Sequence, residues 1–247
     1  MSARTPTRIL VGVGVGPGDP ELVTVKAVRV LQRADVVLVP VMDAGEQGHA
    51  EATVRAHLDH DRVRRTVFAL NERQDTPRRE AAWEAAADAV VAAYDDGAET
   101  VAFATIGDPN VYSTFSYLAQ TVRSRLPDVT VESVPGITAM QDLAARSGTV
   151  LCEGTETLAL VPLTAGVERL RAALESADTV VAYKGGRHLD DMLQVLRDSD
   201  RLADAVYGER LGLPGEEVGP VDEHTGAAPY LSTLLVPARR DRRGGKL

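Results

Sequence analysis

Near its start the sequence reads Ile9-Leu-Val-Gly-Val-Gly-Val-Gly-Pro-Gly-Asp-Pro20, an apolar run that ends in a turn made almost entirely of glycine and proline. Glycine lets a backbone bend sharply or another group approach closely, while Pro17 and Pro20 fix φ. From Leu22 to Leu31 the apolar residues recur at helical spacing. The stretch therefore predicts a strand, a tight turn and a helix, which open an α/β fold with a ligand at the turn. A turn that binds nothing is the alternative.

The turn does not match the dinucleotide-binding fingerprint, which requires G-x-G-x-x-G. Counted from Gly12, the sixth position is Pro17, and counted from Gly14 it is Asp19, whose negative charge opposes a pyrophosphate. No Gly-Lys-Ser/Thr of the Walker type follows. Phosphate binding at this turn is therefore disfavoured.

The composition is ordinary for a globular protein, with 44% hydrophobic and 26% charged residues. A chain of 247 residues is long enough for one large domain or two modest ones, and we favour two. The formal net charge of −9 argues against a nucleic-acid partner, which requires a broad basic field. No apolar run approaches the roughly 20 residues that span a bilayer, and no signal peptide precedes the first strand. We therefore expect a cytoplasmic protein without a membrane partner.

The residue types that bind metals form no recognisable set in the sequence. The single cysteine, Cys152, excludes an intramolecular disulfide. His57 and His60 could share one face of a helix, but no carboxylate or cysteine companion completes a ligand set with them. We therefore expect these histidines to face solvent, and we expect no metal site.

Strands and helices alternate along the first half of the chain, which favours a mainly parallel sheet with helices on both faces. After the opening unit, strands are expected at 35–40, 63–70, 100–105 and 129–134. Helices are expected at 49–58 and 80–94, near Tyr112 and after 135–139, and 71–79 is expected to be a loop. In the second half, strands are expected at 157–161, 178–183, 204–209 and 230–236, with helices at 167–177 and 187–197.

Two later turns repeat the pattern of the first, because each follows a strand and precedes a helix. They read Gly107-Asp-Pro109 and Val134-Pro-Gly-Ile-Thr-Ala139. In open α/β sheets, ligands bind outside the carboxyl ends of strands, so the turns could share one crevice. Together with Val15-Gly-Pro-Gly-Asp-Pro20, these turns resemble the tetrapyrrole methylase family, which transfers methyl groups from S-adenosylmethionine. The likeness extends to about residue 236, and the helix of Trp83 and the segment 111–118 most resemble the branch that methylates precorrin-2 at C20 in cobalamin biosynthesis.

This resemblance implies a class III-type methyltransferase fold with two α/β domains. The first domain, 1–136, carries the glycine-rich turns. The second, 137–247, has a mixed sheet and completes the cofactor cleft, and its end is expected to be frayed from about residue 238. The active site is implied to lie in the trough between the domains. The family also implies a tetrapyrrole substrate, S-adenosylmethionine with S-adenosylhomocysteine as its product, and a homodimer.

The resemblance also implies a set of cofactor contacts, several of them through backbone groups. Carried over to this sequence, they fall on Pro17, Ile106, Gly107, Asp108, Val111, Thr138, Ala139, Lys184 and Leu211. Lys184 and Leu211 depart in type, since other branches carry Met and Gly there. A backbone contact tolerates such changes. For Asp108, capping of a helix N-terminus is the alternative role.

A precorrin carries many carboxylates, so its pocket requires arginine, lysine and backbone donors. The candidate substrate-binding residues are Gly16, Gly18, Asp19, Ser113, Thr114, Arg187 and Arg210. Arg78 and Arg79 are expected in a loop that could close over the substrate, with solvated surface charge as the alternative for each arginine. Methyl transfer depends mainly on placement of the reactants, so we expect no catalytic triad. The catalytic residue is left open among Asp19, Tyr112 and Glu209, with Asp43 or a water as further choices for the base.

Three other functions are weighed against this one. Cobalt-factor II is an alternative substrate that the residues do not separate from precorrin-2. A nicotinamide-dependent oxidoreductase is disfavoured by the missing sixth glycine of the first turn. A non-catalytic tetrapyrrole binder is disfavoured by the intact turns.

Overall fold

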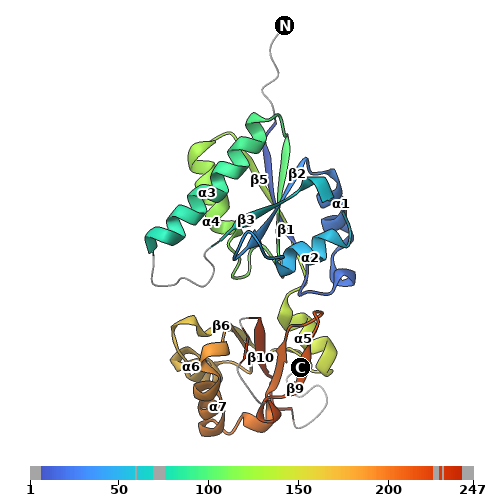
Figure 1. Cartoon of the computed structure of the whole chain (residues 1–247). Helices are drawn as coiled ribbons and strands as arrows, with labels where there is room; N and C mark the ends of the chain where they lie inside the picture. Colours follow the sequence, from blue (N-terminus) through green and yellow to red (C-terminus); the bar gives the residue numbers. More distant parts are fainter. Residues whose placement is uncertain (1–6, 59, 69–75, 225–227, 230, 241–247) are drawn as a thin grey trace. The chain divides into compact units, whose positions relative to one another are not determined.

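The chain divides into two units, Met1–Thr138 and Ala139–Leu247. The computed structural model describes residues 7–58, 60–68, 76–224, 228–229 and 231–240 (Figure 1). Among the described helices, none combines the length and the apolar character needed to cross a membrane.

The first unit is built on a five-stranded sheet in which every described pair of neighbours is parallel. The strand order is β3-β2-β4-β1-β5. The bounds of the strands are β1 (Ile9–Gly14), β2 (Val36–Val41), β3 (Val63–Val67), β4 (Thr100–Thr105) and β5 (Thr130–Val134). The parallel sheet predicted from the alternation of elements is therefore confirmed.

Helices cover both faces of this sheet, as Figure 1 shows. Alternate residues of β1 point to opposite faces, so Leu10 joins the core under α3 and α4, whereas Val11 and Val13 join the core under α1 and α2. The helices are α1 (Val25–Arg33), α2 (His49–Arg55), α3 (Thr76–Asp95) and α4 (Phe115–Arg125).

Two helix starts differ from the prediction. The helix α3 already begins at Thr76, so the expected loop 71–79 is wrong for residues 76–79, while 71–75 lie outside the described residues. Pro77 lies in its first turn, where a proline costs no intrahelical hydrogen bond. The helix expected near Tyr112 begins only at Phe115, because Tyr112 has a left-handed backbone with φ of 50°.

The second unit contains a five-stranded mixed sheet with the order β6-β7-β10-β8-β9. The β6–β7 pair is parallel and the other pairs are antiparallel, which confirms the predicted mixed sheet. Its strands are β6 (Leu158–Pro162), β7 (Thr179–Tyr183), β8 (Val206–Glu209), β9 (Glu217–Pro220) and β10 (Ser232–Val236). The strand β9 was not predicted, because this edge strand contains the weak strand formers glycine and proline.

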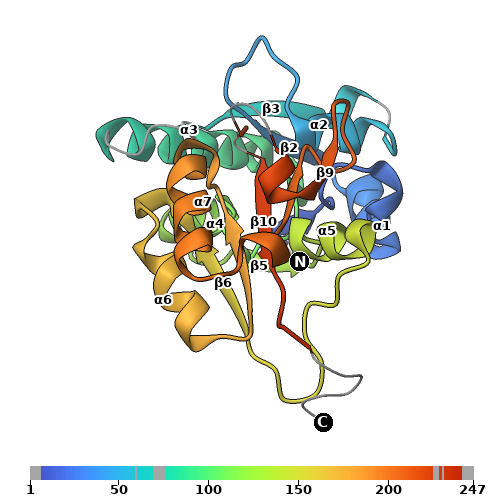
Figure 2. The same ribbon diagram turned by 90° about the horizontal axis from the view of Figure 1, so that it is seen from below.

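Two helices pack on one face of this sheet and one on the other. The helices α6 (Glu168–Ser176) and α7 (Leu189–Asp198) share a core with β7 and β10, and Figure 2 shows them side by side. The helix α5 (Ala139–Ser147) packs on the opposite face through Leu143, which contacts Val181 and Leu235. Short 3-10 helices complete the described elements at Pro20–Leu22, His60–Arg62, Leu163–Ala165, Gly186–His188, Leu202–Asp204 and Val221–Glu223.

The chain remains attached to the second unit beyond residue 237. Ala238 N donates to Thr179 Oγ1 at 2.9 Å, Arg239 Nε pairs with Asp204 Oδ2 at 2.6 Å, and Arg240 Nε donates to Glu156 Oε1 at 2.9 Å. The expectation of a frayed end from about residue 238 is therefore wrong for residues 238–240. Residues 241–247 lie outside the described residues.

A buried carboxylate ties α2 to β3 in the first unit. Glu51 is fully buried, and its two oxygens each lie 2.7 Å from a guanidinium nitrogen, one from Arg55 and one from Arg65. Burial opposes ionisation of this carboxyl, but the two guanidinium groups outweigh it and hold the pKa of Glu51 below its ordinary value. Arg65 also donates to the Ala44 carbonyl at 2.9 Å, so the same group fastens the loop after β2.

We predict that Glu51→Gln lowers the free energy of unfolding by about 1–3 kcal/mol at neutral pH, because charge-assisted hydrogen bonds are lost. The lowered pKa means that this contribution is complete above the unfolded-state pKa, about 4.3, and is lost as the pH falls through the folded-state value. Urea unfolding at pH values of about 7 and about 3 measures the difference between wild type and variant. The exposed Glu99→Gln is the control. An equal difference at both pH values would contradict the role of the ionised carboxylate.

Candidate functional site

The three predicted turns meet at one edge of the first sheet. β4, β1 and β5 are neighbours and run parallel, so the turns that follow them leave from the same edge. Gly107 N donates to the Gly16 carbonyl at 2.7 Å, which joins the first turn to the second. Both glycines have a left-handed backbone, with φ of 78° at Gly16 and 70° at Gly107, which side chains rarely allow.

Packing at this edge leaves no room for a side chain at Gly14 or Gly136. A Cβ added to Gly14 would lie 2.5 Å from the Gly107 carbonyl oxygen and 2.6 Å from the Gly136 nitrogen. A Cβ on Gly136 would collide with the Gly107 carbonyl oxygen, and it would lie 2.8 Å from the Gly14 Cα. The three turns are thus held together backbone against backbone. Contact requires glycine at positions 14 and 136, and the left-handed backbone favours it at positions 16 and 107.

Asp108 connects the second turn to the third. Its Oδ2 accepts a hydrogen bond from Gly136 N at 2.9 Å, and its Oδ1 accepts one from Asn110 N at 2.8 Å. It does not cap α4, which begins seven positions later at Phe115. The Asp108 carboxylate therefore stabilises the contact between the second and third turns. Asp19, by contrast, accepts a hydrogen bond from Glu21 N at 2.9 Å and caps the short helix Pro20–Leu22.

The first turn is also fastened to α2 and to the residues that follow it. Thr53 Oγ1 donates to the Gly18 carbonyl at 3.3 Å, and His57 Nε2 lies 2.9 Å from the Pro20 carbonyl oxygen. His57 is half-buried, so the prediction that it faces solvent is wrong. The side chain of His60 lies outside the described ones. Positions 53 and 57 are four residues apart, so helical spacing places their side chains on one face. That spacing could have indicated that both contact the same neighbouring segment.

Between the second turn and α4, Ser113 accepts from Phe115 N and donates to Thr105 Oγ1, both at 3.1 Å. Thr114 occupies the N-cap position of α4 without a side-chain cap bond. Tyr112 is exposed, and its left-handed backbone changes the direction of the chain before α4 begins.

Four of the predicted cofactor contacts are wholly or partly buried. Ile106 and Val111 are half-buried, Pro17 is buried, and Thr138 is buried at the end of the first unit.

In the second unit, two predicted residues lie at one edge of the mixed sheet. Lys184 follows β7 and Arg210 follows β8, and β10 lies between these strands. Both have left-handed backbones, with φ of 61° at Lys184 and 49° at Arg210. Such a conformation costs a non-glycine residue about 1–3 kcal/mol, which makes both positions unusual.

The remaining candidates have varied environments. Leu211 is buried against Leu143 in the core under α5, and Ala139 is the first residue of α5. The side chain of Arg187 lies outside the described ones. Arg78 and Arg79 lie on α3, so their expected place in a loop is wrong. The Arg79 guanidinium lies over the Trp83 ring, 5.3 Å from its centre.

Glu209 is buried, with 6% of its surface exposed, and accepts a hydrogen bond from Tyr207 Oη at 2.6 Å. Burial first, and the Glu209 carboxylate second, raise the pKa of Tyr207, so the phenol stays protonated and acts as the donor. Asp43, by contrast, is exposed and accepts from Gly45 N at 2.7 Å.

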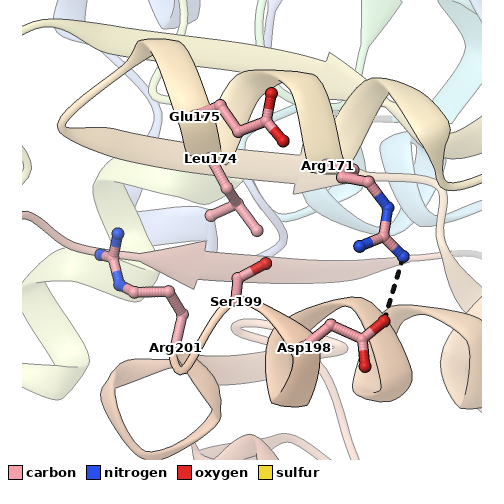
Figure 3. Close-up of a pocket in the computed structure, with 6 residues that line it drawn as sticks. All are labelled: Arg171, Leu174, Glu175, Asp198, Ser199 and Arg201. Carbon is pink, nitrogen blue, oxygen red and sulfur yellow. Dashed lines mark hydrogen bonds and ion pairs between the residues drawn. The ribbon is translucent and has the colours of Figure 1, made fainter.

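A cavity of about 330 Å³ lies between α6 and α7 of the second unit, and none of the residues that line it is a predicted site residue (Figure 3). It is lined by Arg171, Leu174, Glu175, Asp198, Ser199 and Arg201. Arg171 pairs with Asp198 at 3.2 Å, and Arg201 pairs with Asp204 at 3.0 Å. Because both guanidinium groups are already paired, we assign no ligand to this cavity.

Comparison with known proteins gives one family. Residues 9–224 match the family described as tetrapyrrole (corrin/porphyrin) methylases. The chain is 36% identical over 242 residues to a precorrin-2 C(20)-methyltransferase from Sinorhizobium sp, covering 94% of this chain and 96% of that protein. It is 31% identical to the cobalt-precorrin-2 C(20)-methyltransferase of Salmonella typhimurium, covering 92% of this chain and 95% of that protein.

A solved structure shares the fold. The uroporphyrin-III C-methyltransferase of Thermus thermophilus, crystallised with S-adenosyl homocysteine, matches with a TM-score of 0.64 and 24% identity, covering 92% of this chain and 96% of that one. At this identity, the likeness supports the fold alone.

We predict that Gly14→Ala lowers the free energy of unfolding by about 1–3 kcal/mol, because the new methyl group overpacks the backbone junction. Gly219→Ala is the matched control, since no atom lies within 4 Å of a Cβ at that position, and we expect a change within about 0.5 kcal/mol. Urea unfolding of both variants measures the effect. Equal stabilities would show that the junction can relax.

Proposed function

The chain belongs to the tetrapyrrole (corrin/porphyrin) methylase family, and from this we propose that it is an S-adenosylmethionine-dependent C-methyltransferase that methylates precorrin-2 at C20 to give precorrin-3A in cobalamin biosynthesis. The observation that carries the proposal is the 36% identity, over nearly the full length of both chains, to a protein named for this reaction. The junction of the three turns supports it, because the residues that carried the family resemblance meet at one sheet edge.

Methyl transfer from S-adenosylmethionine depends little on acidic or basic side chains. A carbon of the tetrapyrrole attacks the methyl group in line, the carbon–sulfur bond breaks, and its electron pair stays on sulfur to give S-adenosylhomocysteine. A proton is then lost from the methylated carbon. Holding the two reactants in this geometry supplies most of the rate, which fits a site built from glycine, proline and small polar residues.

We propose that the turns of the first unit contact the cofactor mainly through backbone groups of Pro17, Ile106, Gly107, Asp108, Val111 and Thr138. Rigid backbone turns suit this role because their N–H and C=O groups are fixed by the glycine junction. Asp108 acts as a positioning residue, since its side chain is already occupied by two backbone N–H groups.

The other candidates stay predictions. For the cofactor these are Ala139, Lys184 and Leu211, and for the substrate Gly16, Gly18, Asp19, Ser113, Thr114, Arg187 and Arg210. The catalytic choice among Asp19, Tyr112 and Glu209 also stays a prediction. A homodimer and a cytoplasmic location are further predictions, and light scattering of the purified chain tests the first of them.

Cobalt-factor II is the second candidate substrate, supported by the likeness to the Salmonella protein named for a cobalt-containing precorrin-2. Anaerobic incubation with S-adenosylmethionine and each tetrapyrrole in turn should show which one gains a single methyl group. Carbon-13 labelling of the methyl group then locates it by NMR. A methyl group at another carbon would assign the chain to a different branch of the family.

We predict that Asp108→Asn weakens S-adenosylhomocysteine binding by about tenfold to a hundredfold, which corresponds to loss of a charge-assisted hydrogen bond of about 1.5–3 kcal/mol. The amide offers only one acceptor oxygen, so either Gly136 N or Asn110 N loses its partner. Titration calorimetry measures the affinity, with the exposed Asp128→Asn as control. Unchanged affinity and turnover in Asp108→Asn would remove this residue from the site.

The oxidoreductase alternative has a direct test. S-adenosylhomocysteine should raise the melting temperature of the protein, whereas NAD and NADP should not, because only a ligand of the folded state stabilises it. Stabilisation by a nicotinamide nucleotide alone would favour the alternative. Stabilisation by S-adenosylhomocysteine without turnover of either tetrapyrrole would favour a non-catalytic binder.

A further inference from the structure

A group of polar side chains in the second unit is assembled by strand register. Glu209 of β8 lies directly opposite Glu217 of β9 on one side and opposite Ser232 of β10 on the other. Directly opposite residues of antiparallel strands share a face, with Cβ atoms about 4.5–5.5 Å apart. Tyr207, two residues before Glu209, points to the same face. The row therefore places two carboxylates beside each other.

His224 completes this group from the end of the 3-10 helix Val221–Glu223. Its ring lies 4.3 Å from the Tyr207 ring, and its Nδ1 lies 3.4 Å from Glu217 Oε2. Only 6% of its side chain is exposed, and its Nε2 is buried with no hydrogen-bond partner among the described residues. A buried imidazole nitrogen without a partner is costly, and the described residues supply no partner for this one.

The two carboxylates of the row also favour a cation beside them. Like charges directly opposite each other destabilise a sheet. In the part of the chain that the structure describes, neither Glu209 nor Glu217 pairs with a lysine or an arginine. One ligand atom from each of Glu209, Glu217 and His224 lies within 4.8 Å of the others. Metal–ligand bonds of about 2.0–2.2 Å place neighbouring ligand atoms about 3–4 Å apart. The exposed Glu217, on an edge strand, can supply the small remaining closure.

We propose that Glu209, Glu217 and His224 bind one divalent first-row transition-metal ion, with Zn²⁺ as its representative. One imidazole and two carboxylates suit such an ion better than Mg²⁺ or Ca²⁺, which take oxygen ligands. The hydrogen bond from Tyr207 orients the Glu209 carboxylate, as outer hydrogen bonds do for metal ligands. Bound metal joins the edge strand β9 and the following 3-10 helix to β8.

Metal binding needs neither cofactor nor tetrapyrrole, so it is tested separately from the proposed methyl transfer, for which Glu209 is also a candidate catalytic residue. The expectation of no metal site missed these three residues, since they are eight and seven residues apart and belong to separate elements. Only the pairing of β8 with β9 brings them together.

The experiment uses the full chain without an affinity tag, freed of metal by a chelator and then titrated with Zn²⁺ in competition with a chromophoric chelator. We expect one ion per chain, and Co²⁺ in its place should give visible d–d absorption bands. Glu217→Ala and His224→Gln should each weaken binding at least about tenfold, and Tyr207→Phe about 10–100-fold. His188→Ala removes a histidine elsewhere in the second unit and should leave binding unchanged.

Glu217 has 63% of its side chain exposed, so Glu217→Ala should stay folded even if His224→Gln does not. Circular dichroism checks this. The proposal is overturned if the wild-type chain binds no Zn²⁺ at about 100-fold molar excess, or if folded Glu217→Ala binds as tightly as wild type.

Discussion

The close packing of glycine backbones at the ends of β1, β4 and β5 is the constraint on which the first unit depends. Gly14 and Gly136 approach the Gly107 carbonyl too closely for any Cβ between them. The strands must therefore end in turns of fixed shape, and Asp108 fixes that shape by accepting a hydrogen bond from the third turn. A site made in this way presents backbone groups, so it tolerates changes of neighbouring side chains.

The second unit reaches a comparable result by different means. Its mixed sheet inserts β10 between β7 and β8, so that the ends of two strands that run in the same direction lie on either side of the start of an antiparallel one. Lys184 and Arg210 turn the chain there with left-handed backbones although neither is glycine. The same register places Glu209 opposite Glu217. A bound cation relieves the repulsion between these two carboxylates.

Much of the fold could be predicted because its signals are local. Strand and helix alternation gave the parallel sheet, and the three glycine turns gave the edge at which the candidate residues lie. The prediction failed where local signals mislead. Glu217-Val-Gly-Pro220 has a composition typical of loops and becomes a strand only because β8 offers it a free edge. Arg240 belongs to a segment that resembles a solvated tail, but Glu156 binds it.

The sequence by itself determined where the backbone turns and what family the chain resembles, since glycine, proline and apolar periodicity act over a few residues. Tertiary structure alone decided which side chains meet. Asp108 and Gly136 are 28 residues apart, and Thr53 and Gly18 are 35 apart. Glu209, Glu217 and His224 converge only through strand register. Such contacts depend on strand order and pairing, which no short stretch of sequence encodes.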